Sequence, residues 1–214
     1  MGTLAAAFVK GHQEAGVAAC AKHFPGHGDT DLDSHLALPT LRHDEKRLQS
    51  VELPPFKAAI GAGVASVMTA HVIYEALDKT RPATLSVKVL RPLLRGQMKF
   101  DGVIISDDLE MKAVADHHSI EDLVQMGLEA GCDHFLCCKD VERAGRAVEA
   151  ANVLAEKSPA IAAQVRESAA RIRALKKHFL GMYAPPDAKE AKAILQAPAH
   201  LKLVDQIRAL QPVG

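Results

Sequence analysis

The densest group of ionisable side chains lies in one short segment, Lys22-His23-Phe24-Pro25-Gly26-His27-Gly28-Asp29-Thr30-Asp31-Leu32-Asp33-Ser34-His35, directly after the apolar run 16–21. A second group, Ser106-Asp107-Asp108, ends the apolar run 103–105. Parallel α/β folds carry their functional side chains at the carboxyl ends of strands. Both segments are therefore candidate parts of one active site.

Asp107 and Asp108 follow an apolar strand, where a carboxylate points into the mouth of a parallel sheet. Two adjacent residues on an extended backbone face opposite ways, so only one of the two can enter that mouth. Either aspartate could instead cap the next helix, and the pattern alone leaves both interpretations open.

Asp33 and His35 stand two residues apart, a spacing that lets the carboxylate accept a hydrogen bond from one ring nitrogen. Such a partner fixes the tautomer and raises the basicity of the imidazole, which suits a general acid/base. The alternative is a surface loop whose polar residues cap turns. Lys22 and His23 are expected to begin this loop, where lysine could hold a substrate hydroxyl or carboxylate or pair with an aspartate.

A metal site is a further alternative, because mixed imidazole and carboxylate ligands suit zinc or manganese. No helical His-x-x-x-His supplies a rigid face, however, and glycine and proline make this segment bend. We therefore expect neither a metal nor an organic cofactor. His71, at the end of another apolar run, is interpreted as a structural histidine with satisfied hydrogen bonds. The potential ligands are His23, His27, Asp29, Asp31, Asp33 and His35.

Apolar runs alternate with helical patterns over residues 3–138, which predicts four β-α repeats and a parallel sheet covered by helices. Expected strands are 17–22, 65–70, 102–106 and 134–138; expected helices are 3–14, 53–62, 86–98, 119–130, 141–157 and 160–179, with one or two more in 187–211 packed by Ile194, Leu195, Leu203 and Ile207. Ser86 and Ser119 are expected N-caps, and Pro92 should kink its helix or delay its start.

The composition excludes several classes of protein. Lysine plus arginine and aspartate plus glutamate number 26 each, and there are two tyrosines and no tryptophan, so nucleic-acid binding is not expected. Four cysteines do not make a disulfide framework, and we expect them to be buried as small hydrophobic residues. No leader or membrane-spanning run is visible, which favours a cytoplasmic protein without a membrane partner.

Several longer motifs make the chain resemble the N-acetyl-β-glucosaminidases of glycoside hydrolase family 3, the type that recycles peptidoglycan. The resemblance covers roughly residues 1–180. Its two long motifs are residues 22–35 and 100–111; shorter ones are Leu38-Pro39, Glu52-Leu53-Pro54-Pro55-Phe56, Val67-Met68-Thr69-Ala70-His71-Val72, Pro82-Ala83-Thr84-Leu85-Ser86 and Ala130-Gly131-Cys132-Asp133.

The resemblance implies an α/β fold, a TIM-type (β/α)8 barrel of which this chain holds the C-terminal half, about four β/α units, plus C-terminal helices. On this basis residues 1–180 form a partial barrel and residues 181–214 a helical extension. It also implies a retaining mechanism that removes non-reducing terminal β-linked N-acetylglucosamine from peptidoglycan fragments.

The resemblance further implies a role for each matching residue. Asp107 matches the nucleophile, His35 the general acid/base and Asp33 the partner that orients it. Lys22 and His23 match the pair that grips the sugar hydroxyls. The family's preceding half, with further sugar-binding residues, has no counterpart in this chain.

Two functions compete at this stage, with a metal-dependent hydrolase as a weaker third. One is an exo-acting β-N-acetylhexosaminidase, working with a missing N-terminal half or through self-association. The other is a truncated, inactive product of a split gene. Because four strands cannot close an eight-stranded barrel, we expect little hydrolysis from the isolated chain.

Overall fold

A computed structural model describes residues 1–30, 38–182, 184–185, 187–195 and 197–210. Contacts divide the chain into one unit spanning Met1–Phe179 and a second spanning Leu180–Gly214. The helices of the first unit are α1 (Gly2–Glu14), α2 (Glu45–Arg47), α3 (Leu53–Gly61), α4 (Lys112–Ala115), α5 (Ile120–Ala130), α6 (Val141–Lys157) and α7 (Pro159–Leu180, which ends one residue beyond it). Shorter or wider helical segments are η1 (Leu48–Glu52), η2 (Ala83–Leu85) and η3 (Val89–Gln97).

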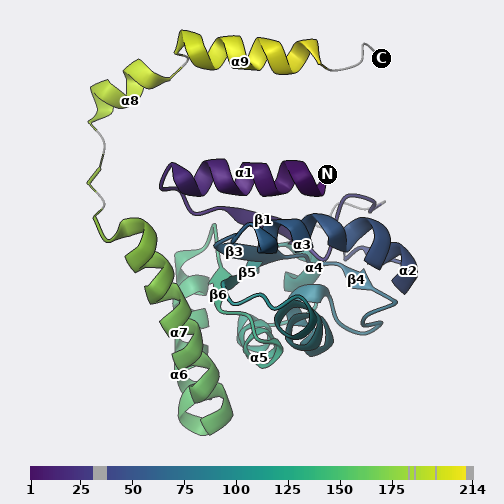
Figure 1. The fold of residues 1–214 in the computed structure, drawn as a ribbon. Coiled ribbons are helices and arrows are strands. Elements are labelled where there is room, and N and C mark those ends of the chain that lie inside the picture. The colour runs from purple at the N-terminus through teal and green to yellow at the C-terminus, as the bar shows by residue number, and fades with distance from the viewer. Residues whose placement is uncertain (31–37, 183, 186, 196, 211–214) are drawn as a thin grey trace. The chain divides into compact units, whose positions relative to one another are not determined.

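Four parallel strands form the central sheet, in the order β1 (Cys20–Phe24), β3 (Ser66–Thr69), β5 (Val103–Asp108) and β6 (His134–Leu136). The strands therefore lie side by side in chain order, as the predicted β-α repeats require. Helix α1 packs against α3, and α5 packs against α6 (Figure 1). A small parallel pair, β2 (Thr40–Leu41) and β4 (Ile73–Tyr74), lies outside this sheet. Within the described residues the sheet is open, not a closed barrel.

Strand boundaries differ from the sequence prediction, and two of the differences concern candidate site residues. The first strand begins at Cys20 and runs to Phe24, so Lys22 and His23 lie within β1 instead of beginning the loop. Strand β5 extends to Asp108, which places Asp107 on the strand itself. Apolar residues and turn signals locate a strand, but its ends depend on its pairing with neighbouring strands.

Helix ends follow the expected capping chemistry. The Ser119 hydroxyl accepts a hydrogen bond from Asp122 N, and Gly131 ends α5 with a φ of 102°, a conformation that favours glycine. The Ser86 hydroxyl accepts a bond from Val89 N at 3.3 Å at the start of the next helical segment. Pro92 does not interrupt this segment, which continues through it as the π-helix η3. A wider turn accommodates a residue that has no N–H to donate.

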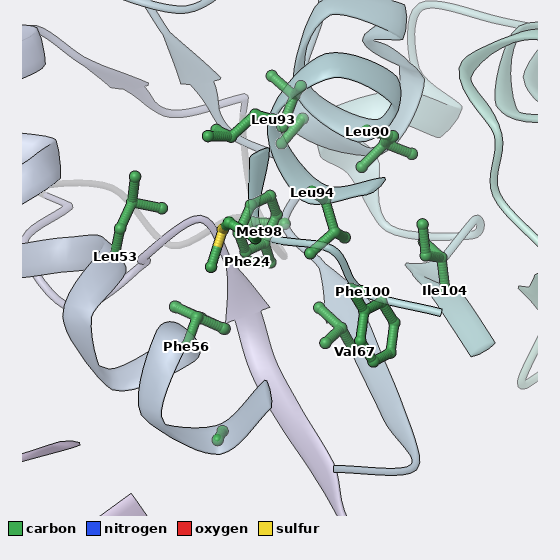
Figure 2. Packing of buried hydrophobic residues seen from close by; sticks show 14 of the residues in the cluster. Phe24, Leu53, Phe56, Val67, Leu90, Leu93, Leu94, Met98, Phe100 and Ile104 are labelled. Carbon is green, nitrogen blue, oxygen red and sulfur yellow. The ribbon is translucent and has the colours of Figure 1, made fainter. Parts of the chain in front are cut away.

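The larger hydrophobic core packs residues of β1, β3 and β5 against residues of α3 and η3. Phe24 and Phe56 meet edge to face at 5.2 Å between ring centroids, and Leu90 and Leu94 of η3 pack near them (Figure 2). Ile104 of β5 completes the cluster. A second core forms where α5 meets α6; its buried members are Leu85, Leu109, Val114, Ile120, Leu123, Val124, Leu128, Ala147, Ala150 and Ile161.

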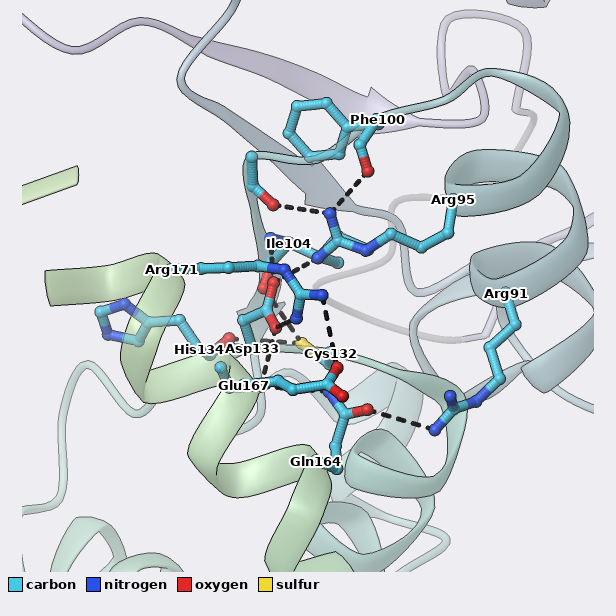
Figure 3. A network of polar contacts seen from close by, with 12 residues as sticks. Arg91, Arg95, Phe100, Ile104, Cys132, Asp133, His134, Gln164, Glu167 and Arg171 are labelled. Atoms are coloured by element: carbon cyan, nitrogen blue, oxygen red, sulfur yellow. Dashed lines mark hydrogen bonds and ion pairs between the residues drawn. The ribbon is translucent and has the colours of Figure 1, made fainter. Parts of the chain in front are cut away.

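Asp133 is the centre of a buried polar network that fastens α7 and η3 to the sheet (Figure 3). Its carboxylate accepts bonds from Arg95 Nη2 at 2.5 Å, Ile104 N at 2.9 Å, Ser168 Oγ at 2.7 Å and Arg171 Nη1 at 3.1 Å. Asp133 directly precedes β6. The network therefore lies at the amino end of the strands, the end that stabilises α/β folds.

The cysteines only partly follow the prediction of burial. All four are free thiols; Cys132 is buried and Cys137 half-buried, but Cys20 and Cys138 are exposed. Cys20 begins β1, an outer strand of the sheet, which pairs with β3 on one side and, within the described residues, with no strand on the other.

The second unit consists of α8 (Ala188–Ile194) and α9 (Pro198–Ala209). The prediction of helices here is confirmed, but the apolar side chains do not pack within this unit, since Ile194, Leu203 and Ile207 are more than half exposed and Leu195 is 72% exposed. No described helix of the chain is long and apolar enough to span a membrane.

Candidate active site

Asp107 occupies the carboxyl end of β5, with its side chain 18% exposed. The apolar residues before it bury the strand, while its own carboxylate emerges where the strand leaves the sheet. Asp107 Oδ1 accepts a hydrogen bond from Asp108 N at 2.9 Å. This bond fixes one carboxylate oxygen against the main chain.

His23 reaches Asp107 from a strand that is not its neighbour. Its Nε2 lies 3.7 Å from Asp107 Oδ2, although β3 separates β1 from β5 in the sheet. The pairing of β1 with β3 is irregular between Ala21 and Phe24, the stretch that carries His23. Lys22 is exposed on the same stretch. The structure thus brings His23 and Asp107 together.

Asp108 does not share the role of Asp107. Its Oδ1 accepts a bond from Glu110 N at 3.1 Å and caps the turn after β5. Helix α4 begins beyond this turn without a side-chain cap, so neither aspartate caps a helix. The Glu110 carboxylate accepts bonds from Lys139 N and Asp140 N, which ties the turn after β5 to the segment after β6.

His71 lies fully buried beneath this end of the sheet. Its Nδ1 contacts Thr84 Oγ1 at 2.9 Å and its Nε2 contacts the Asp108 carbonyl at 3.0 Å. Burial lowers the pKa of His71, and the bond to Asp108 and the nearby Asp107 and Asp108 carboxylates only partly oppose that effect. The interpretation of His71 as a histidine with satisfied hydrogen bonds is confirmed.

Two residues that carried no predicted role hold the segment that follows β1. The Tyr74 hydroxyl donates to the Gly26 carbonyl at 2.6 Å. Gly26 has a φ of 135°, and a Cβ there would approach Glu52 Cβ to 2.8 Å, so this position requires glycine. No local pattern in the sequence connects Tyr74 or Glu52 to the loop, and sequence reasoning missed both.

Among the described residues of the segment after β1, Asp29 is the last acidic one. Its Oδ2 lies 3.0 Å from His43 Nε2 and 3.2 Å from Arg47 Nη2, and the same Arg47 pairs with Glu52 at 3.2 Å. Arg47 and His43 were not among the predicted site residues. They belong to α2 and the residues before it, and no pattern in the sequence indicated that these residues lie beside the loop.

Asp33 and His35 fall in residues 31–37, outside the described residues, so their predicted partnership stays a prediction. Asp31, a potential metal ligand, lies there as well. No group of three or more His, Cys, Asp or Glu side chains suited to a metal occurs among the residues that are described.

Comparison with known proteins gives consistent matches. The profile described as "Glycosyl hydrolase family 3 N terminal domain" matches residues 1–175. The chain is 42% identical over 139 residues to a β-hexosaminidase of Alkalilimnicola ehrlichii, covering 65% of this chain and 40% of that protein. It is 43% identical over 138 residues to a β-hexosaminidase of Shewanella frigidimarina, covering 64% and 40%. The chain thus spans about two-fifths of the length of these curated relatives.

Solved structures give the same result. A family 3 β-N-acetylglucosaminidase from Paenibacillus superposes with a TM-score of 0.77 at 39% identity, covering 86% of this chain and 35% of that one. The β-N-acetylglucosaminidase from Thermotoga maritima gives a TM-score of 0.71 at 34% identity, covering 78% and 36%. At these identities the chain resembles both enzymes in sequence as well as in fold.

Proposed function

Because this chain belongs to glycoside hydrolase family 3, we propose that it carries the nucleophile and sugar-gripping residues of a retaining β-N-acetylhexosaminidase. The observation that carries the proposal is the 3.7 Å approach of His23 Nε2 to Asp107 Oδ2 at the carboxyl edge of the sheet. Two strands separated by a third converge there on one partly exposed carboxylate. A parallel α/β sheet binds its substrate at this edge.

The proposed reaction has two steps. In the first, the Asp107 carboxylate attacks the anomeric carbon, the bond from that carbon to the leaving oxygen breaks, and protonated His35 gives its proton to that oxygen. In the second, neutral His35 takes a proton from water, whose oxygen displaces Asp107 and releases the sugar. Asp33 would orient His35, while Lys22 and His23 would hold sugar hydroxyls. No cofactor enters either step.

We propose non-reducing terminal β-linked N-acetylglucosamine of peptidoglycan fragments as the substrate. The names of the related β-N-acetylglucosaminidases support the sugar. The four free thiols support a reducing compartment such as the cytoplasm.

We also propose that the four-stranded sheet is the C-terminal half of a (β/α)8 barrel, with residues 1–180 as the partial barrel and 181–214 as a helical extension. Within the described residues, β1 and β6 each have one unpaired edge, where further parallel strands would continue the sheet. Such strands would come from a further segment or from a second copy. The similarity to longer family 3 structures supports this arrangement.

The test is hydrolysis of a chromogenic β-N-acetylglucosaminide by two proteins. One is this chain alone, from which we expect little turnover. The other is a hybrid in which residues 1–175 replace the matching region of the Alkalilimnicola ehrlichii β-hexosaminidase. In the hybrid, Asp107→Asn should lower kcat about a thousandfold or more. Asp101→Asn, an exposed aspartate just before β5, should leave it unchanged.

A second measurement identifies the nucleophile directly. A 5-fluoro glycosyl fluoride of N-acetylglucosamine should leave a sugar covalently bound to the peptide that contains Asp107, detected by mass spectrometry. Labelling of another carboxylate, or full turnover by a folded Asp107→Asn hybrid, would contradict the proposal.

A further inference from the structure

His71 joins two elements that meet at the candidate nucleophile. It follows β3, is fully buried, and contacts Thr84 of η2 through Nδ1 and the Asp108 carbonyl of β5 through Nε2. Thr69 and Thr84 are also fully buried, and the Thr69 hydroxyl donates to Thr84 Oγ1 at 2.8 Å. Three buried polar side chains therefore form one chain of hydrogen bonds that ends on the main chain of Asp108.

The direction of these bonds follows from the groups themselves. A carbonyl oxygen only accepts, so His71 Nε2 must carry a proton and donate it to Asp108. Burial lowers the pKa of His71, which favours a neutral ring whose Nδ1 is an acceptor. The Thr84 hydroxyl then donates to Nδ1, and the Ala70 carbonyl, 3.0 Å from that hydroxyl, still accepts the Thr84 N–H at 3.2 Å. The neutral tautomer with its proton on Nε2 therefore gives the Thr69 and Thr84 hydroxyls and both nitrogens of His71 a hydrogen-bond partner.

The regular ladder between β3 and β5 does not extend to Asp107. Its last paired residues are Met68 and Ile105. On the opposite side, the pairing of β5 with β6 is irregular between Ile105 and Asp108. The ladder is therefore interrupted at Asp107. It resumes on the β6 side, where Asp108 pairs with Leu136 and Leu109 N donates to the Leu136 carbonyl at 2.9 Å, while the bond from His71 holds Asp108 on the β3 side.

Both main-chain polar groups of Asp108 are engaged. Its N–H donates to Asp107 Oδ1 at 2.9 Å, and its carbonyl accepts from His71 Nε2 at 3.0 Å and from Met111 N at 3.1 Å. With Oδ1 held in this way, Oδ2 is the oxygen that faces His23. The Asp108 N–H and carbonyl belong to consecutive peptide groups joined at the Asp108 Cα, so the orientation of the Asp107 carboxylate depends on where the main chain of Asp108 lies.

We propose that His71 is a positioning residue that fixes the Asp108 main chain, and through it the direction of the Asp107 carboxylate, by donating its Nε2 proton to the Asp108 carbonyl. The inference rests on the proposed function in that Asp107 is taken as the nucleophile. It adds that the histidine acts without touching the substrate.

Two substitutions of similar polarity distinguish a positioning role of His71 from a role in packing alone. In His71→Gln, the side-chain amide can place an N–H near the position of Nε2 and restore the bond to Asp108. In His71→Asn, the shorter amide reaches the position of Nδ1, near Thr84, but not Asp108. Both variants bury one side-chain amide, so they differ chiefly in whether that amide can donate a hydrogen bond to the Asp108 carbonyl.

The readout is hydrogen exchange of the Asp108 amide, followed by NMR in the complete chain, which needs no turnover. In His71→Asn we expect the Asp108 N–H to exchange about tenfold faster or more, because its bond to Asp107 Oδ1 loosens when the main chain of Asp108 moves. In His71→Gln the exchange rate should match that of the original chain. In the hybrid enzyme, His71→Asn should lower kcat about tenfold with little change in KM.

An unchanged rate of Asp108 amide exchange in folded His71→Asn would overturn the proposal, whatever the outcome for catalysis. A second measurement needs no substitution: the imidazole 15N shifts of His71 should be those of the neutral Nε2–H tautomer at pH 7, and an Nδ1–H tautomer or an imidazolium would refute it. If instead Asp107→Asn leaves turnover intact in the hybrid, the proposed function fails while these NMR results still decide the role of His71.

Discussion

Removing the Asp133 carboxylate should be among the most destabilising single changes in this chain. The side chain is fully buried and accepts four bonds, two from guanidinium groups of Arg95 and Arg171 that are 18% and 29% exposed. Asp133→Ala would leave both cations, Ser168 Oγ and Ile104 N without this acceptor. Loss of one partner of a buried ion pair costs about 3–5 kcal/mol, so we expect the free energy of unfolding to fall by that amount.

Urea unfolding followed by circular dichroism measures this loss, and thermal unfolding should show a Tm lower by roughly 6–20 °C. Glu167→Ala is the matched control, because Glu167 pairs with the same Arg171 at 3.4 Å but its side chain is 62% exposed. It should cost about 0.3–0.5 kcal/mol. If Asp133→Ala costs no more than Glu167→Ala, the assignment of this network as the fastening of α7 to the sheet is wrong.

Three further predictions concern packing, pH and thiol chemistry. Gly127→Ala should destabilise the chain by about 1–3 kcal/mol in urea, because the added Cβ would overlap the Phe135 ring, whereas Gly145→Ala, with open space in α6, should be neutral or stabilising by up to about 1 kcal/mol; equal effects would contradict the packing. Because burial lowers the pKa of His71, the unfolded chain binds a proton below about pH 6.5 that the folded chain does not. The free energy of unfolding should therefore fall as the pH drops below that value, by at most about 1.4 kcal/mol per pH unit from this group, and less steeply in His71→Gln. Burial raises the pKa of Cys132 to about 12, so iodoacetamide at pH 8 should label it only after unfolding, as mass spectrometry of the native protein would test.

Local sequence was enough to place the elements that carry the site. The apolar run before Asp107 predicted a strand over 102–106, and β5 extends two residues further, to Asp108. Ser119 and Gly131 marked the two ends of α5. These features depend on neighbours in the chain, whose spacing and capping chemistry can be read without knowing the fold.

The sequence motifs also led to family 3, which the comparisons establish, because long stretches such as residues 100–111 carry their residue types together. Their exact place on the strands was less predictable. Lys22 and His23 proved to lie within β1, since the end of a strand is set by the partner that pairs with it.

What only the tertiary structure decided is which distant residues meet. His23 approaches Asp107 past an intervening strand, and His71 donates to the carbonyl of Asp108. Asp133 collects four donors from three separate parts of the chain, η3, β5 and α7. Each contact depends on strand order, on register and on where a ladder becomes irregular. Those properties arise from packing of the whole sheet against its helices, so no local window of sequence contains them.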